Sequence, residues 1–194
     1  MSGGEELRRS QIQVPDVSED IDQALVALSD EQRRSDAASA RRREHWLLHQ
    51  ARSEGSMPGV LTDLAERSTP LALHTLAGIV VRGTLSAVGS DFVAVVGPAD
   101  ETVLVPLGAI TTVQPEPGST ATIGDRRAPT SSTSFGGALE ELGAERPQVS
   151  VRTVSGDRVT GRLEWAGRDV AAVRTPNTAE TYVATAAIND VTLP

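Results

Sequence analysis

The chain of 194 residues contains no cysteine and few aromatic residues: two Phe, two Trp and one Tyr. Without cysteine, disulfide bonds, thiolate metal sites and thiol catalysis are excluded. The absence of disulfide bonds is typical of proteins in a reducing compartment. No apolar run approaches the roughly 18 to 20 residues that a membrane-spanning helix needs. The N-terminal stretch lacks the apolar core of a secretory signal. We therefore expect a cytoplasmic protein that does not contact a membrane.

The chain also has no lysine, and its 26 Asp and Glu outnumber its 18 basic residues, giving a net charge of -8. Proteins that bind a nucleic-acid backbone usually present a basic surface, because their binding releases counterions from the phosphates. The composition therefore does not favour nucleic-acid binding, although a local cluster of Arg side chains can still provide such a surface.

An internal repeat organises the C-terminal two thirds of the chain. Residues 58–116 align with residues 136–194 without a gap, so each residue of copy one matches the residue 78 positions later. The string GTLSAVGSDFVAV at 83–95, for example, returns as GRLEWAGRDVAAV at 161–173. Identical residues fall at turn glycines and at inward-facing apolar positions, as expected when one backbone is built twice.

Each copy predicts a short helix followed by five strands. The first helix is PGVLTDLAERS, with Ser56 as its N-cap, and the second is FGGALEELGAER. The expected strands are 71–76, 79–88, 91–96, 102–106 and 109–113, and then 149–154, 157–166, 169–174, 181–185 and 187–191. Positive-φ turns are expected at Gly78, Gly89, Gly156 and Gly167, and bends of the long second strand at Gly83 and Gly161.

With these motifs in place, each copy resembles an Sm-like barrel of the LSm or Hfq type. The motif positions are Leu73, Leu76, Gly78, Val81, Gly83, Leu85, Val88 and Asp91 in copy one, and Val151, Val154, Gly156, Val159, Gly161, Leu163, Ala166 and Asp169 in copy two. An Ala-Ile pair precedes the last strand at 109–110 and 187–188. The whole layout is also similar to an uncharacterised family of actinobacterial tandem-repeat proteins.

The resemblance implies a mainly β protein with two tandem, five-stranded bent barrels, each with a leading short helix. Residues 56–116 form the first expected barrel and 135–194 the second, joined by a flexible linker at 117–134 that is rich in Pro, Gly, Ser and Thr. A long N-terminal helix is predicted at residues 18–55, because residues 18–54 include many good helix formers and neither Pro nor Gly. Residues 1–17 are expected to be disordered.

The family also suggests how the barrels associate and what they bind. Sm-like barrels pair the fourth strand of one subunit with the fifth strand of the next, because unpaired edges recruit partners. Two barrels on one chain pair with each other, or three chains form a six-barrel ring. The Lys-His pair with which Hfq-type proteins bind RNA is replaced here by Leu107-Gly108 and Thr185-Ala186.

Catalytic and metal sites are weakly indicated. Asp91 and Asp169 recur at the start of the third strand, where an Asp usually hydrogen-bonds nearby backbone, so we interpret them as turn residues rather than catalysts. His45 and His49 share the i, i+4 spacing of metal ligands but no third ligand accompanies them. We therefore expect no catalytic residue, metal, cofactor or small-molecule substrate.

Two groups of residues are candidates for contacting RNA or a protein partner. They are Arg41, Arg42, Arg43 and Trp46 in the N-terminal helix, and Arg152, Arg158, Arg162, Trp165 and Arg168 in copy two. The helix arginines either contact phosphates or an acidic partner, or pair with acidic residues of their own helix. Trp165 stands where copy one has Ala87, and is either an interface anchor or part of the core.

The sequence thus predicts a non-enzymatic assembly, adaptor or regulatory protein. It associates with itself or with another protein through strand edges and the N-terminal helix. The alternative is an Hfq-like RNA-binding post-transcriptional regulator that uses the arginine groups in place of the missing pocket.

Overall fold

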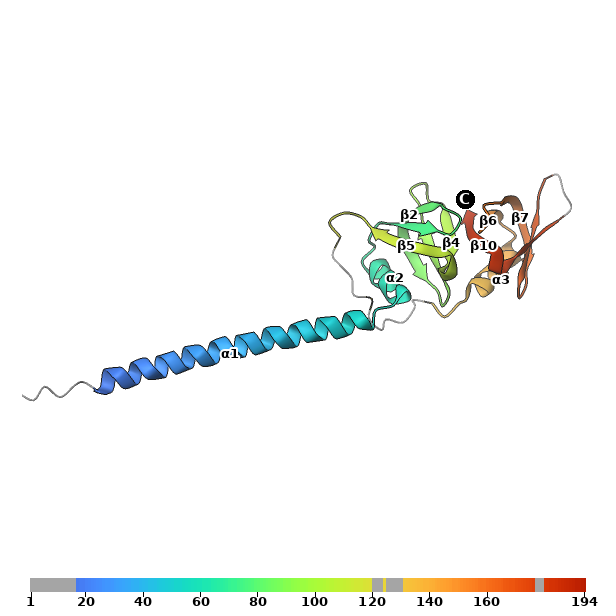
Figure 1. The fold of residues 1–194 in the computed structure, drawn as a ribbon. Helices are drawn as coiled ribbons and strands as arrows, with labels where there is room; N and C mark the ends of the chain where they lie inside the picture. The colour runs from blue at the N-terminus through green and yellow to red at the C-terminus, as the bar shows by residue number, and fades with distance from the viewer. Residues whose placement is uncertain (1–16, 120–123, 125–130, 177–179) are drawn as a thin grey trace, which may run out of the picture. The chain divides into compact units, whose positions relative to one another are not determined.

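The computed structural model describes residues 17–119, 124, 131–176 and 180–194 (Figure 1). The chain divides into two compact units, Met1–His49 and Gln50–Pro194. The expected disordered N-terminus lies almost wholly outside the described residues, as does most of the expected linker at 117–134. Within the described ranges, no helix is both long enough and apolar enough to cross a membrane.

Helix α1 spans Val17–Ser53. Arg52 lies in its last turn, where a positive charge interacts favourably with the helix dipole. Near this end the apolar side chains of Trp46 and Leu47 are 63% and 59% exposed. The helix therefore carries apolar surface that its own unit leaves in contact with solvent.

Two shorter helices begin the repeats. Helix α2 spans Met57–Glu66 and α3 spans Phe135–Glu145. Each starts with a serine cap, because Ser56 Oγ accepts a hydrogen bond from Gly59 N and Ser134 Oγ accepts one from Gly137 N, both at 3.2 Å. The N-cap predicted at Ser56 is confirmed.

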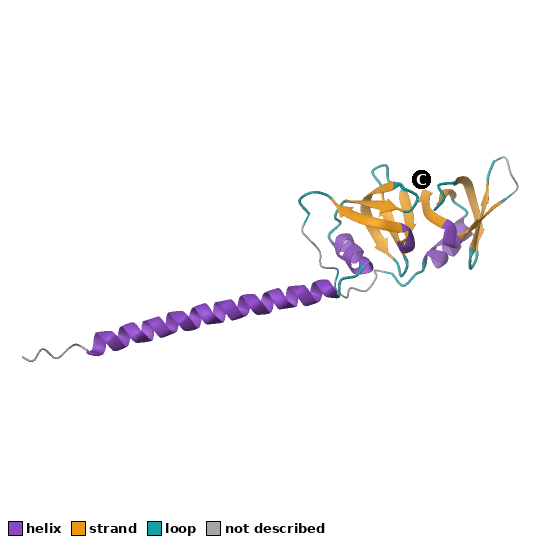
Figure 2. Ribbon diagram, in the orientation of Figure 1, coloured by secondary structure: helices purple, strands orange, loops and turns teal. Residues whose placement is uncertain are grey.

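The described chain is mainly β, as the repeat predicted, and its ten strands form one antiparallel sheet (Figure 2). The first repeat supplies β1 (Leu71–Thr75), β2 (Val80–Val88), β3 (Phe92–Val96), β4 (Thr102–Pro106) and β5 (Ile110–Pro115). The second supplies β6 (Gln148–Thr153), β7 (Arg158–Ala166), β8 (Val170–Arg174), β9 (Thr181–Ala184) and β10 (Ile188–Leu193). The order is β5-β1-β2-β3-β4-β10-β6-β7-β8-β9, so β5 and β9 are the two edges.

The long strands β2 and β7 bend at corresponding places. Each has a register shift, between Leu85 and Ala87 in β2 and between Leu163 and Trp165 in β7. At Gly161 a Cβ would lie 2.2 Å from the carbonyl oxygen of Arg174, so only glycine permits this close approach of β8. A bulge therefore interrupts the second strand of each copy, two to four residues after the glycine at which the bend was expected.

Two of the four turn-glycine predictions are wrong. Gly78 and Gly156 have positive φ, as hairpin turns require, but Gly89 and Gly167 do not. Gly89 is needed for a different reason, since a Cβ there would lie 2.2 Å from the ring of Phe92. At this position the turn leaves no room for a side chain, although the backbone does not have a positive φ.

Two apolar clusters form the core of the sheet. One lies wholly within the first repeat and includes Leu61 and Leu64 of α2. The other belongs to the second repeat but also contains Phe92, Ala94 and Leu104 from the first. The second repeat therefore buries apolar surface of the first, which places a packed interface in the middle of the sheet.

Candidate protein-interaction site

The two repeats join edge to edge where β4 lies antiparallel to β10, a junction we call the seam (Figure 1). Leu104 of β4 lies opposite Val191 of β10. On the other side of β4, Leu107 N donates to Asp91 O at 2.8 Å. Because hydrogen-bonding directions alternate along an antiparallel strand, this bond points the N–H and C=O of Leu104 toward Val191. The outer edge of β4 is thus satisfied by the other repeat.

Apolar side chains pack across the seam. The rings of Phe92 and Phe135 lie 6.1 Å apart between centroids, tilted by 55°. Ala94 and Leu104 are each 7% exposed and pack in the cluster of the second repeat. Asp91 Oδ1 accepts a hydrogen bond from Phe135 N at 2.6 Å, which fixes the start of α3 against the first repeat. The seam therefore combines strand pairing with a desolvated apolar interface.

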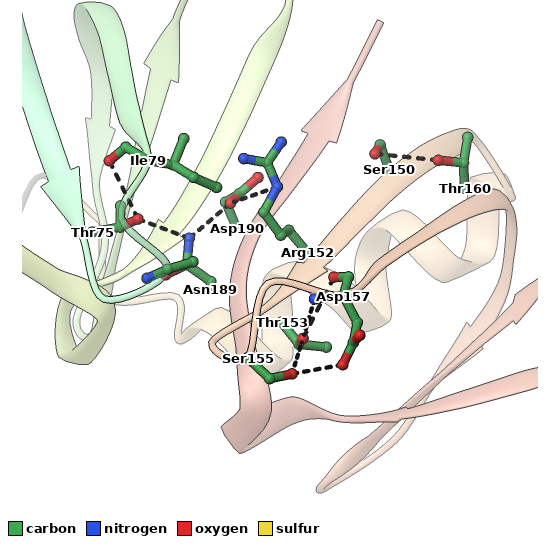
Figure 3. A network of polar contacts seen from close by, with 11 residues as sticks. Thr75, Ile79, Ser150, Arg152, Thr153, Ser155, Asp157, Thr160, Asn189 and Asp190 are labelled. Atoms are coloured by element: carbon green, nitrogen blue, oxygen red, sulfur yellow. Dashed lines mark hydrogen bonds and ion pairs between the residues drawn. The ribbon is translucent and has the colours of Figure 1, made fainter.

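A buried polar network completes the seam (Figure 3). Asn189 is fully buried, and its Oδ1 accepts a hydrogen bond from Ala77 N at 3.0 Å. Its Nδ2 donates to Thr75 Oγ1 at 3.0 Å and to Asp190 Oδ2 at 2.8 Å. Arg152 Nε lies 3.9 Å from the same Asp190 oxygen. Since a buried amide without partners is costly, these contacts specify how the second repeat sits on the first.

The turn of the second repeat that corresponds to Thr75–Ile79 satisfies itself (Figure 3). Ser155 Oγ donates to Asp157 Oδ2 at 2.7 Å and lies 2.8 Å from Thr153 Oγ1. Asp157 N donates to Thr153 Oγ1 at 3.1 Å. Copy one has Ala77 and Ile79 in place of Ser155 and Asp157, so its turn depends on Asn189 from outside.

Strands β5 and β9 are free edges in the part of the chain that the structure describes. Thr185 N donates to Asp169 O at 2.9 Å, and Tyr182 lies opposite Ala172. By the same alternation as in β4, the N–H and C=O of Tyr182 point away from β8 and outward from the sheet. An outward row of this kind is a template for another strand.

Beside the β9 edge lies an exposed aromatic pair. Trp165 of β7 and Tyr182 of β9 are both in register with Ala172 of β8, and their ring centroids are 6.3 Å apart. Trp165 is 43% exposed and Tyr182 63% exposed, while Ala172 beneath them is buried. We call these three residues the aromatic face. Amphipathic aromatic side chains in such a position are typical anchors of protein interfaces.

Charged groups surround the aromatic face. Tyr182 Oη donates a hydrogen bond to Glu180 Oε2 at 2.8 Å. This hydrogen bond and the negative charge of Glu180 raise the pKa of Tyr182 above its usual 10.0. Arg174 Nε lies 3.0 Å from Glu164 Oε1, and its Nη2 lies 3.4 Å from Glu180 Oε1. The phenol therefore stays neutral at physiological pH, beside Glu164 and Glu180 and the one guanidinium of Arg174 that bridges them.

A cavity of about 510 Å³ lies where the two repeats meet. Its walls include Asp91 and Gly108 of the first repeat and Arg168, Asp169 and Thr185 of the second. The structure thus brings the two repeated aspartates to one cavity, which the sequence did not indicate. Asp91 is already hydrogen-bonded to Phe135 N, so this carboxylate has a structural role.

The predicted contact residues occupy separate places. Arg42 Nη2 donates to Ser39 Oγ and Arg43 Nε to Ser39 O within α1, while Arg41 and Trp46 are exposed there. In the second repeat, Arg152 belongs to the buried network, and Arg168 lines the cavity. Arg158 lies opposite Arg152 on β7, and Arg162 lies opposite Arg174 four residues further on. In the second repeat, Arg152 is thus held in the buried network, while Arg158, Arg162 and Arg168 are exposed.

Among the described residues, no group of three or more His, Asp or Glu side chains is placed to hold a metal ion. The fold and the seam define the chain as a tandem-repeat β protein whose repeats share one antiparallel sheet. No family model matches the chain, and no curated protein matches it significantly.

Proposed function

We propose that the chain is a non-enzymatic, cytoplasmic assembly or adaptor protein that binds other proteins through its strand edges and helix α1. Within this proposal the five strands of each repeat form a bent, Sm-like barrel. The observation that carries the proposal is the seam itself, because it is a working example of edge-to-edge binding between two copies of this fold. The same two kinds of edge remain open at β5 and β9.

The side chains near the open edge support binding of a protein. The aromatic face offers apolar side chains that a partner can bury, next to backbone groups that point outward from β9. A strand of the partner can pair with the backbone groups, while the aromatic side chains select which strand binds. On α1, Trp46, Leu47 and Leu48 are 63%, 59% and 41% exposed, and provide a second, helical anchor. Asp91 serves to hold α3, which favours a structural role over acid–base chemistry.

An affinity capture experiment with edge variants tests this function. The tagged full chain is compared with Tyr182→Pro, which removes the outward N–H of β9, and with Trp46→Ala together with Leu47→Ala in α1. We expect specific host proteins that co-purify with the wild type and are lost with either variant. Thr160→Ala, at an exposed position of β7, is the matched control. Capture that is identical for all four proteins contradicts the proposal.

RNA binding is the alternative, and the exposure of Arg41, Arg158, Arg162 and Arg168 favours it. Binding of labelled uridine-rich and adenosine-rich RNA over a salt series decides between the two. Phosphate contacts give an affinity that falls steeply as salt increases. Salt-dependent binding at micromolar protein, lost when Arg41, Arg42 and Arg43 are replaced together by Ala, supports RNA recognition through α1. An absence of such binding excludes it.

A further inference from the structure

The aromatic face differs in chemistry from the corresponding surface of the first repeat. Trp165 and Tyr182 stand where the first repeat has Ala87 and Leu104, in the same cross-strand register. Ala87 and Leu104 pack in the cluster of the second repeat, whereas the two aromatic side chains are exposed. Large rings thus replace the small and aliphatic side chains that a covering repeat packs against. The ligand of the aromatic face therefore follows from its own side chains.

The two rings form a rigid apolar ledge above Ala172. Their centroids lie 6.3 Å apart and their planes are tilted by 52°, so the rings are in contact and a ligand lies over them rather than between them. The hydrogen bond from Tyr182 Oη to Glu180 fixes the orientation of the phenol. A ledge of this kind suits a compact apolar ring that loses little conformational freedom on binding, such as the pyrrolidine ring of proline.

The carboxylates beside the ledge are already occupied. Glu180 accepts the hydrogen bond from Tyr182 Oη through Oε2 and pairs with Arg174 through Oε1. Glu164 Oε1 lies 3.0 Å from Arg174 Nε, and its Oε2 lies 3.8 Å from Arg146 Nη1. The outward N–H and C=O of Tyr182 belong to the edge of the sheet and not to its face. All four carboxylate oxygens thus have a partner, and neither glutamate needs a cation from a ligand.

Hydrogen-bond donors, in contrast, remain free on this face. Among the described residues, the indole N–H of Trp165 and the guanidinium of Arg162 have no hydrogen-bond or ion-pair partner. Arg162 is in register with Arg174, which lies two residues from Ala172 on β8, so both arginines share the face of the rings. The face therefore calls for a ligand that supplies acceptors and negative charge but needs few acceptors in return.

A proline-rich segment has this chemistry. Proline has no backbone N–H, so each proline residue offers a carbonyl acceptor and no donor. In the polyproline II conformation the carbonyls make no internal hydrogen bonds and stay available. A sugar or a β-strand, in contrast, brings donors that need acceptors on the protein. The hydrogen-bonding groups of the aromatic face thus select the proline-rich ligand.

We propose that the aromatic face binds an acidic, proline-rich segment of a partner protein in the polyproline II conformation. A proline ring lies on the two aromatic rings, a carbonyl oxygen accepts the indole N–H of Trp165, and an acidic side chain pairs with Arg162. This inference rests on the proposed function, since it names the chemistry of the partner that the aromatic face recognises. The backbone edge of β9 stays open beside the bound segment.

The geometry of the face sets the spacing within the ligand. The row of Arg162 and Arg174 lies two residues along the strand from the row of the rings, a distance of about 7 Å. Two residues of a polyproline II helix span about 6 Å. The acidic residue therefore stands two positions from the proline that contacts the rings. The peptide Pro-Pro-Glu-Pro-Pro meets this spacing in both chain directions.

Fluorescence anisotropy of labelled peptides titrated with the full chain measures the binding. We expect Pro-Pro-Glu-Pro-Pro to bind, and Gly-Gly-Glu-Gly-Gly, which lacks the rings and the preformed conformation, to bind at least about tenfold more weakly. Pro-Pro-Lys-Pro-Pro binds about threefold more weakly, because it places a positive charge beside Arg162. Arg162→Gln removes this preference for Glu over Lys.

Conservative ring substitutions separate the indole N–H from the apolar contact. Trp165→Phe keeps a ring but removes the donor, and weakens binding by about three- to tenfold, the effect of one net hydrogen bond. Tyr182→Phe is the matched control and leaves the affinity unchanged, because the phenol donates to Glu180 and not to the ligand. Trp165→Ala and Tyr182→Ala each weaken binding by at least about tenfold.

The indole signals in a nitrogen–proton NMR spectrum locate the peptide without any change to the face. The chain has two tryptophans and therefore two indole N–H signals, which Trp46→Phe assigns. We expect Pro-Pro-Glu-Pro-Pro to shift the signal of Trp165 and to leave the signal of Trp46 in place.

Four results overturn the inference. They are no binding of Pro-Pro-Glu-Pro-Pro at millimolar protein, equal binding of the glycine peptide, an affinity that Trp165→Ala and Tyr182→Ala leave unchanged, and a Trp165 indole signal that does not move. None of these contradicts the adaptor function, which depends on capture of host proteins that the edge and α1 variants lose. Peptide binding without such capture keeps the proline-rich site and removes the adaptor role.

Discussion

Replacement of Asn189 by Ala removes the polar network that holds the first repeat on the second. Ala77 N loses its acceptor, which costs about 1 kcal/mol because this turn is partly accessible to water. Thr75 Oγ1 loses a donor at a cost of about 1 kcal/mol, and the Asp190 carboxylate loses a hydrogen bond worth about 2 kcal/mol. Since neighbouring contributions are not additive, we expect about 3 kcal/mol in total.

Urea unfolding, followed by the fluorescence of Trp165 in a Trp46→Phe background, measures this loss. The melting temperature falls in parallel by roughly 6 to 12 °C, given the size of the unit. Thr111→Ala is the control at the matching position of the first repeat, where the side chain is exposed and bonds only His74 O at 3.0 Å. Its cost stays below about 1 kcal/mol.

Equal costs for Asn189→Ala and Thr111→Ala would refute the reasoning, since Asn189 is buried against the other repeat whereas Thr111 is exposed. A loss below about 1 kcal/mol for Asn189→Ala refutes it as well, because buried donors and acceptors left without partners cannot be that cheap.

Three further predictions follow from the same contacts. Gly161→Ala destabilises the chain by about 2 kcal/mol in thermal unfolding, because the added Cβ meets the carbonyl oxygen of Arg174. Gly136 has open space around it in the first turn of α3, so Gly136→Ala is neutral or stabilising. Equal effects of the two substitutions contradict the close approach of β8 at Gly161. Both repeated aspartates are exposed, but Asp91 bonds Phe135 N across the seam. Asp91→Ala therefore costs about 1 kcal/mol and Asp169→Ala less than about 0.5 kcal/mol; the reverse order in urea unfolding removes the structural role of Asp91. Tyr182 is the only tyrosine, so absorbance at high pH reports its titration alone. Glu180 raises the pKa of Tyr182, so Glu180→Gln moves the midpoint down toward the usual 10.0, and an unchanged midpoint contradicts the contact.

Local structure was largely predictable from the sequence because it depends on neighbouring residues. The mainly β class and the ten strand positions follow from repeated apolar alternation, and the Ser56 cap follows from its place before Pro58. The positive φ predicted at Gly89 was wrong because glycine there leaves room for the Phe92 ring, a contact that no local pattern encodes. Glycine is required both where a neighbouring side chain leaves no room for a Cβ and where a turn needs a positive φ. The residue type alone therefore does not distinguish the two.

The seam was not predictable in the same way, because it joins residues far apart in the chain. The string AINDV reads as an ordinary last strand, yet Asn189 is fully buried against a turn 112 residues earlier. Phe92 looks like a core residue of its own repeat, but packs on Phe135 of the other. Differences between the copies, such as Thr111 against Asn189 and Ala87 against Trp165, were the available signal. They mark which side of each repeat is covered.

Hydrogen–deuterium exchange of four backbone amides tests the central claim most directly, namely that the seam joins the two repeats and leaves the edges of β5 and β9 open. The amides of Leu104 and Val191, which face each other across the seam, exchange slowly. The amides of Tyr182 and Val113, which point outward from the two open edges, exchange fast. Fast exchange at Leu104 and Val191, or slow exchange at Tyr182 and Val113, contradicts the account.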